Sequence, residues 1–93
     1  MSGRLLRITD RVQGVGYRAW FQHEAQARGL TGWVRNRRDG SVEAEVHGTK
    51  EALADIERSA RRGPPLAEVV AVQVTQVPDS GAGAGAVEIR PTQ

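Results

Sequence analysis

The chain has 93 residues, of which 39% are hydrophobic and 26% are charged, and its formal net charge is +2. This composition is typical of one globular domain, here residues 1–93, and excludes an intrinsically disordered chain. The sequence contains no cysteine, which excludes disulfides, thiol catalysis and thiolate metal sites. Its two histidines, His23 and His47, fall on different predicted elements, so a zinc site is not expected. We expect no other metal and no cofactor.

No apolar run in the sequence is long enough for a signal peptide or a membrane-spanning helix. We therefore expect a cytoplasmic protein with no membrane partner. The excess of basic residues is mild and would help to attract a small anion, but it is weak evidence for nucleic acid.

Hydrophobic periodicity divides the chain into strands and helices. It predicts strands at 4–9, 30–37, 41–47, 68–77 and 87–90, and helices at 17–28 and 50–62. Thr49 suits the cap position of the second helix, and Gly29 suits the end of the first. No role follows from the pattern for the Gly/Ala segment 79–86.

Alternation along the predicted strands assigns side chains to two faces. Leu6 and Ile8 are expected inward, as are Val42, Ala44 and Val46, whereas Glu43, Glu45 and His47 are expected outward. The resulting order is βαββαβ, with a possible short fifth strand. It predicts an α+β, ferredoxin-like sandwich in which two helices cover one face of an antiparallel sheet.

Residues 11–18 join the first strand to the first helix and contain two glycines, Gly14 and Gly16. Glycine lets backbone N–H groups turn towards one point, and a helix N-terminus adds unpaired N–H groups and a partial positive charge. Arg18 falls in the first turn of that helix and could add a planar guanidinium fork. We therefore predict an anion cradle, most simply for a phosphoryl group, although a Gly-x-Gly alone is a weak signal.

Asn36 is the second unusual residue, because asparagine is disfavoured inside a strand. It shares parity with Val34, so its side chain is expected to tilt towards the helix-bearing side of the sheet. A polar strand end before the Asp39-Gly40 hairpin is the competing interpretation. Trp33, beside it, is expected to be a packing residue rather than a platform for stacked bases.

These motifs resemble those of the acylphosphatase family. The resemblance rests on Arg11-Val12-Gln13-Gly14-Val15-Gly16-Tyr17-Arg18, on Gly32-Trp33-Val34-Arg35-Asn36 and on Asp39-Gly40-Ser41-Val42-Glu43, and it extends over nearly the whole chain. It implies the same sandwich fold and the metal-independent hydrolysis of carboxyl-phosphate anhydrides. By similarity, Arg18 matches the phosphate-binding arginine and Asn36 the asparagine that positions the attacking water.

The residues are compatible with this chemistry. A carboxylate is a good leaving group, and phosphoryl transfer depends mainly on positioning and charge stabilisation, so no strong general acid is needed. Gln13, Gly14, Val15, Gly16, Tyr17 and Arg18 form the expected phosphate-binding set. The expected partner is a small-molecule acyl phosphate, and the expected state is a monomer. The sequence does not identify the physiological acyl phosphate.

One position departs from the family pattern. Asp10 stands where relatives usually carry glycine, and a carboxylate at the root of a phosphate cradle should repel the anion unless a nearby arginine neutralises it. A weakly active or non-catalytic acyl-phosphate-binding module is therefore the alternative function. RNA-binding sheets need exposed aromatic residues on their central strands. An RNA-binding module is disfavoured because three of the four aromatic residues, Tyr17, Trp20 and Phe21, fall on the first predicted helix. A domain serving a larger enzyme, as in hydrogenase maturation, is a further rival.

Overall fold

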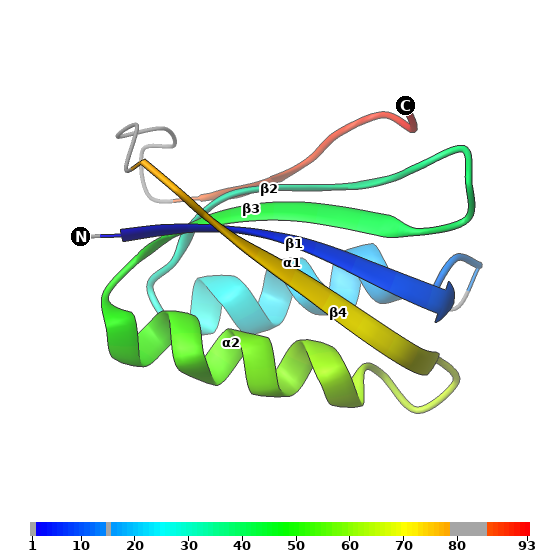
Figure 1. Cartoon of the computed structure of the whole chain (residues 1–93), viewed down its shortest axis with the longest axis horizontal. Helices are drawn as coiled ribbons and strands as arrows, with labels where there is room; N and C mark the ends of the chain where they lie inside the picture. The colour runs from blue at the N-terminus through cyan, green and yellow to red at the C-terminus, as the bar shows by residue number, and fades with distance from the viewer. Residues whose placement is uncertain (1, 15, 79–85) are drawn as a thin grey trace.

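A five-stranded sheet carries two helices across one of its faces (Figure 1). The computed structural model describes residues 2–14, 16–78 and 86–93, with the backbone alone at Asp10 and Arg11. In chain order its elements are β1 (Ser2–Arg11), α1 (Tyr17–Ala27), β2 (Thr31–Asn36), β3 (Val42–Gly48), α2 (Lys50–Arg62), β4 (Glu68–Val77) and β5 (Val87–Ile89).

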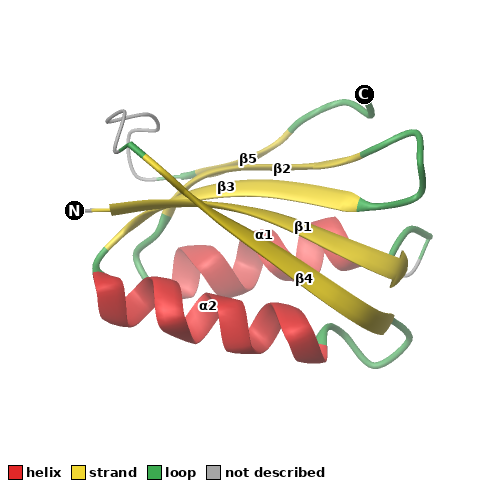
Figure 2. Cartoon of the chain, in the orientation of Figure 1, coloured by secondary structure: helices red, strands yellow, loops and turns green. Residues whose placement is uncertain are grey.

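The spatial order of the strands is β4-β1-β3-β2-β5. β1 pairs antiparallel with β3 and β4, β2 pairs antiparallel with β3, and β5 adds to the edge of β2 in parallel. This confirms the predicted ferredoxin-like sandwich, and β5 is the expected short fifth strand (Figure 2). The Gly/Ala segment 79–86 lies outside the described residues, apart from its last residue.

All predicted elements are present, and the main difference is the length of β1. The sequence predicts 4–9, whereas β1 spans Ser2–Arg11. The strand is longer because it pairs with β4 from Gly3 opposite Val77 to Arg11 opposite Glu68. Cross-strand pairing therefore extends a strand beyond the segment that alternation alone marks.

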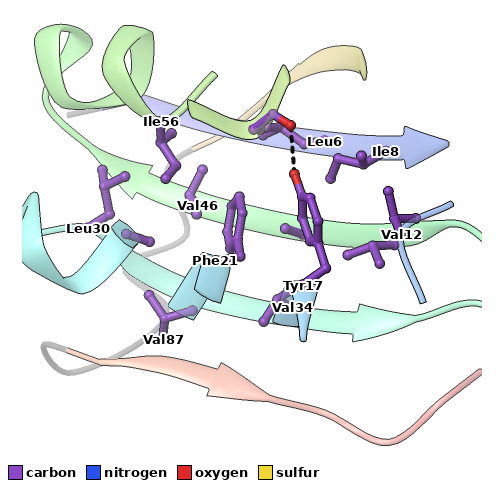
Figure 3. Packing of buried hydrophobic residues seen from close by; sticks show 14 of the residues in the cluster. Leu6, Ile8, Val12, Tyr17, Phe21, Leu30, Val34, Val46, Ile56 and Val87 are labelled. Atoms are coloured by element: carbon purple, nitrogen blue, oxygen red, sulfur yellow. Dashed lines mark hydrogen bonds between the residues drawn. The ribbon is translucent and has the colours of Figure 1, made fainter. Parts of the chain in front are cut away.

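The core lies between the sheet and the two helices (Figure 3). The predicted stripe of α1, namely Tyr17, Phe21 and Ala25, is fully buried in it. Tyr17 sits at the first turn of α1, and its hydroxyl donates a 2.8 Å hydrogen bond to the carbonyl of Ala60 in α2. Burial raises the pKa of this hydroxyl well above its ordinary value. The start of α1 is thus fixed to the end of α2.

The ends of the helices follow the sequence signals. Thr49 caps α2 by accepting a 3.2 Å hydrogen bond from the N–H of Ala52. After α1 the chain turns at Gly29, whose φ of 73° is in the left-handed region. Gly32 has a stricter requirement, because a Cβ at this position would lie 1.8 Å from the carbonyl oxygen of Glu45 on β3.

Two side chains of β2 and β3, Trp33 and His47, are buried. His47 was expected on the outward face, yet it is only 3% exposed, because its ring packs over the bare backbone of Gly3. Trp33 is 9% exposed, with the guanidinium groups of Arg35 and Arg90 lying 4.7 Å and 5.0 Å from its ring centroid. The covered ring supports packing rather than base stacking as its role.

Candidate active site

The loop between β1 and α1 turns at its two glycines. Gly14 has a φ of 73° and Gly16 a φ of 78°, both in the left-handed region. A Cβ at either position would meet no atom within 4 Å, so the backbone conformation rather than lack of space explains the glycines. An L-residue in this conformation costs roughly 1–2 kcal/mol.

The loop leads into the N-terminus of α1, which no side chain caps. Gly16 is the N-cap of α1 and has no side chain to cap it, and its carbonyl accepts the first helical bond, at 3.0 Å, from the N–H of Trp20. The N–H groups of Tyr17, Arg18 and Ala19 therefore have no acceptor within the helix. Unpaired donors and the positive end of the helix dipole favour an anion at this point.

A hollow of about 220 Å³ lies against this helix end. It brings together the glycine loop, the first turn of α1, the end of β2 and the end of β5. Its lining consists of Val12, Gly14, Gly16, Tyr17, Arg18, Ala19, Asn36 and Ile89. Arg18 and Asn36, which are far apart in the sequence, thus lie around one space.

Arg18 differs from most of the described arginines in forming no ion pair with a described carboxylate. Seven others form ion pairs within 4.0 Å of an acidic side chain: Arg4, Arg7, Arg28, Arg35, Arg37, Arg58 and Arg90. Those without a described partner are Arg18 itself, which is half-buried, and Arg38, Arg61 and Arg62, which are exposed. Among the described residues that line the hollow, Arg18 is the one charged side chain, and no carboxylate lies beside it.

Asn36 ends β2 just before a tight turn. Arg37 donates a 2.8 Å backbone bond to the carbonyl of Ser41, which closes the hairpin. Within it Asp39 accepts bonds from the Ser41 hydroxyl at 2.6 Å and from the Ser41 N–H at 2.9 Å. These hydrogen bonds, with Arg7 beside them, lower the pKa of Asp39 to about 2. The turn that follows Asn36 is therefore held by its own side chains.

The backbone of Asn36 is also held by the segment after β5. The N–H of Gln93 donates to the carbonyl of Asn36 at 3.1 Å, and the N–H of Arg38 donates to the carbonyl of Gln93 at 2.9 Å. The end of β2 at Asn36 is thus hydrogen-bonded to the hairpin on one side and to the segment after β5 on the other.

The structure gathers most of the predicted site residues at the hollow. Gly14, Gly16, Tyr17, Arg18 and Asn36 all line it. Because the Tyr17 side chain is in the core, this residue offers the site only its backbone. Val15, and the side chain of Asp10, lie outside what the structure describes.

Gln13 is placed differently from its predicted companions. It is not among the residues that line the hollow, and its side-chain amide donates to the carbonyls of Arg37 and Ser41. His23 is exposed on α1 and is not among the residues that line the hollow.

Three residues of the hollow were not singled out by the sequence: Val12, Ala19 and Ile89. Ala19 could have been found, because it shares the first turn of α1 with Arg18. Ile89 could not, because its position depends on the pairing of β5 with β2, where it lies opposite Val34.

The described residues give no sign of two other kinds of site. No three histidine, aspartate or glutamate side chains gather among them in a way that could hold a metal ion. Neither helix in the described part of the chain has the length and apolar character needed to cross a bilayer.

Fold and site together define a ferredoxin-like sandwich in which a glycine loop, an arginine and an asparagine surround one hollow. Comparison with known proteins identifies the family within this class. Residues 5–84 match the family model described as Acylphosphatase, and the chain belongs to the acylphosphatase family.

Individual relatives agree with this assignment. The chain is 54% identical over 84 residues to an acylphosphatase of Azoarcus sp. (strain BH72), covering 89% of this chain and 86% of that protein. It is 55% identical over 69 residues to an acylphosphatase of Rhodopseudomonas palustris (strain ATCC BAA-98 / CGA009), covering 74% and 70%.

Solved structures extend the likeness to the fold. The crystal structure of acylphosphatase from Bacillus subtilis is similar with a TM-score of 0.92 at 34% identity, covering 97% of this chain and 99% of that one. Full-length HypF, in its phosphate- and nucleotide-bound form, gives a TM-score of 0.88 at 27% identity over 98% of this chain, but the match covers only 12% of the HypF chain.

Proposed function

We propose that the protein hydrolyses the carboxyl-phosphate bond of acyl phosphates, giving a carboxylate and phosphate. The observation that carries the proposal is that Arg18 and Asn36 line one hollow at the uncapped N-terminus of α1. Membership of the acylphosphatase family supports it over most of the chain.

In this mechanism the phosphoryl group binds at the helix end. Backbone N–H groups from Gln13 to Arg18 and the Arg18 guanidinium donate to its oxygens. Hydrogen bonds to charged groups contribute roughly 1.5–3 kcal/mol each. Those that strengthen as charge develops in the transition state lower the barrier, whereas those that are equal in the ground state only improve binding.

Asn36 orients the attacking water. Its Oδ1 accepts a hydrogen bond from the water and directs the oxygen at phosphorus, in line with the leaving carboxylate. A phosphorus–oxygen bond forms to the water as the phosphorus–oxygen bond to the acyl group breaks, and the electron pair of that bond leaves with the carboxylate. The proton of the water passes to a phosphoryl oxygen of the substrate, so the protein needs no separate base.

The proposal also covers the substrate, the cofactors, the cellular location and the oligomeric state. The substrate is a small-molecule acyl phosphate, and neither a metal nor a cofactor takes part. The protein acts as a cytoplasmic monomer of one domain, with no nucleic-acid or membrane partner. The exposed sheet face supports the absence of RNA binding, since Arg35 and Arg90 already cover the ring of Trp33.

The test is phosphate release from acetyl and benzoyl phosphate by purified protein in EDTA. We expect Arg18→Ala to lower kcat/KM by about 100- to 1,000-fold, the usual effect of removing one transition-state donor. Asn36→Ala should lower kcat to a similar extent while KM changes little, because the water rather than the phosphate is misplaced.

Arg61→Ala is the matched control, because it removes an exposed arginine of α2 that does not line the hollow. Its rate should stay within about twofold of the wild type, as for surface substitutions in general. Full turnover by Asn36→Ala would refute the water-orienting role.

A binding module without catalysis is the second candidate function. The likeness to a segment that makes up 12% of the HypF chain favours it, because the same fold occurs there inside a much longer protein. A protein that binds phosphate tightly but releases none from acetyl or benzoyl phosphate would select this alternative.

A further inference from the structure

The side chain of Gln13 joins the glycine loop to the β2–β3 hairpin. Its Nε2 donates to the carbonyl of Arg37 at 2.6 Å and to the carbonyl of Ser41 at 2.9 Å. The two acceptors lie 24 and 28 positions further along the chain. We call this pair of hydrogen bonds the Gln13 bridge.

The chemistry of the bridge requires the amide nitrogen. Both partners are carbonyl oxygens, so a side-chain oxygen in this place would face two acceptors with no proton between them. The two protons of the NH₂ group are both used, one for each carbonyl. The Gln13 side chain is therefore occupied by the hairpin and has no donor left for a phosphate.

The bridge adds to bonds that the hairpin already makes. The Arg37 carbonyl also accepts a 3.1 Å bond from the N–H of Gly40, and the Ser41 carbonyl accepts a 2.8 Å bond from the N–H of Arg37. A carbonyl oxygen can accept two hydrogen bonds. Gln13 thus fills the second acceptor site on each of the two carbonyls that define the turn.

The bridge lies between the two halves of the candidate active site. Gln13 directly precedes Gly14, which begins the glycine loop, and Arg37 directly follows Asn36. Gln93 bonds the same strand end from its other side, through the carbonyl of Asn36. With the bridge in place, the loop and the end of β2 cannot shift independently of each other.

We propose that Gln13 is a positioning residue, whose bridge to the hairpin fixes Asn36 opposite the phosphate loop. The kinetic part of this inference rests on the proposed acyl phosphate hydrolysis. Misplacing a reacting group by about 1 Å can cost about 100-fold in rate, so Gln13→Ala should lower kcat by about 10- to 100-fold. KM should change less than threefold, because the N–H groups of the helix end remain.

The test begins with a measurement that needs no turnover. Nuclear magnetic resonance relaxation of the free protein should show that Gln13→Ala loosens the Asn36 side-chain amide and the backbone amides of Arg37 and Gly40. Gln13→Glu, which keeps the shape but turns an oxygen towards two carbonyls, should have the same effect. Unchanged order at Asn36 in both variants would overturn the proposal.

Gln22→Ala is the matched control. Gln22 also uses its Nε2 to donate to a backbone carbonyl, that of Val87 at 2.7 Å, and it is also half-buried, but it joins α1 to β5. This variant should lose similar stability and leave the order of Asn36 and kcat within about twofold of the wild type. Equal loosening of Asn36 by Gln22→Ala would show a general structural effect and contradict the proposal.

A double-mutant cycle then separates positioning from direct phosphate binding. If Gln13 acts through Asn36, Gln13→Ala should cost less than about twofold in kcat once Asn36→Ala is present, because coupled residues are not additive. A full multiplicative loss on Asn36→Ala would assign Gln13 an independent role and overturn the proposal. If the wild type hydrolyses no acyl phosphate, the proposed function fails, and the relaxation measurement alone decides the inference.

Discussion

At the scale of single residues, the lining of the hollow combines a charged side chain with apolar ones. Arg18 supplies the charge, and Ile89, at the end of β5, is one of its apolar lining residues. Ile89 is 38% exposed, so part of its side chain is free to contact a bound molecule. An acyl phosphate combines the same two characters, since the phosphoryl group is charged and an acyl group can be apolar.

We therefore expect Ile89 to favour substrates with a large apolar acyl group. Ile89→Ala should reduce the preference for benzoyl over acetyl phosphate, measured as the ratio of kcat/KM values, by about tenfold. This is the lower end of what a lost apolar contact costs in a specificity pocket, because the hollow is open. The hydrolysis of acetyl phosphate should change little.

Leu66→Ala is the control for this prediction. Leu66 is also a large exposed hydrophobic residue, at 75% exposure, and it does not line the hollow. The benzoyl-to-acetyl ratio should be the same in Leu66→Ala as in the wild type. A ratio that Ile89→Ala leaves unaltered would place the acyl group elsewhere.

At the scale of elements, the hydrogen bond from Tyr17 to Ala60 connects the first turn of α1 to the last turn of α2 (Figure 3). Tyr17→Phe keeps the ring in the core but leaves the Ala60 carbonyl without its buried donor. An unsatisfied buried group costs about 1–3 kcal/mol. For a domain of this size each kcal/mol lowers Tm by roughly 4–8 °C, which thermal unfolding at neutral pH would measure.

The same residue predicts how stability changes in alkali. Because burial raises the folded-state pKa of Tyr17, its contribution is complete below the unfolded pKa of about 10 and is lost as pH rises above it. The wild type should therefore lose stability above about pH 10, and Tyr17→Phe should lose less. Parallel curves for the two proteins would contradict the assignment, and since the chain has one tyrosine, tyrosinate absorbance reports on Tyr17 directly.

The sequence predicted the elements better than the contacts between them. Periodicity found both helices and the strand that ends at Asn36, and the two glycines marked the loop, because these signals are local. The bridge from Gln13 was not predictable, since it joins positions 24 and 28 residues apart. Gln13 was predicted as a phosphate-binding residue from its place beside the glycines, and this stays a prediction for its backbone N–H, whereas its side chain is bonded to the hairpin.

The effect of Asp10 on anion affinity also stays a prediction.

At the scale of the whole molecule, the sheet order creates the site. β1 and β2 lie on either side of β3, so the loop after β1 and the turn after β2 meet at the same end of the sheet (Figure 1). α1 crosses the helix-bearing face and presents its N-terminus at that end. No element supplies the hollow alone, and an anion bound there contacts several parts of the fold at once.

Binding of inorganic phosphate should therefore stabilise the entire fold. A ligand that binds only the folded state at ten times its Kd adds about 1.4 kcal/mol, which corresponds to roughly 6–11 °C in Tm here. Arg18→Ala should lose most of this increase, because Arg18 is the charged side chain among the described residues that line the hollow. Asn36→Ala should keep it, since its proposed partner is water rather than phosphate. Phosphate also stabilises proteins generally by exclusion from their surface, so the informative quantity is the difference between wild type and Arg18→Ala. An equal rise in Tm for those two proteins would show that the hollow does not bind phosphate.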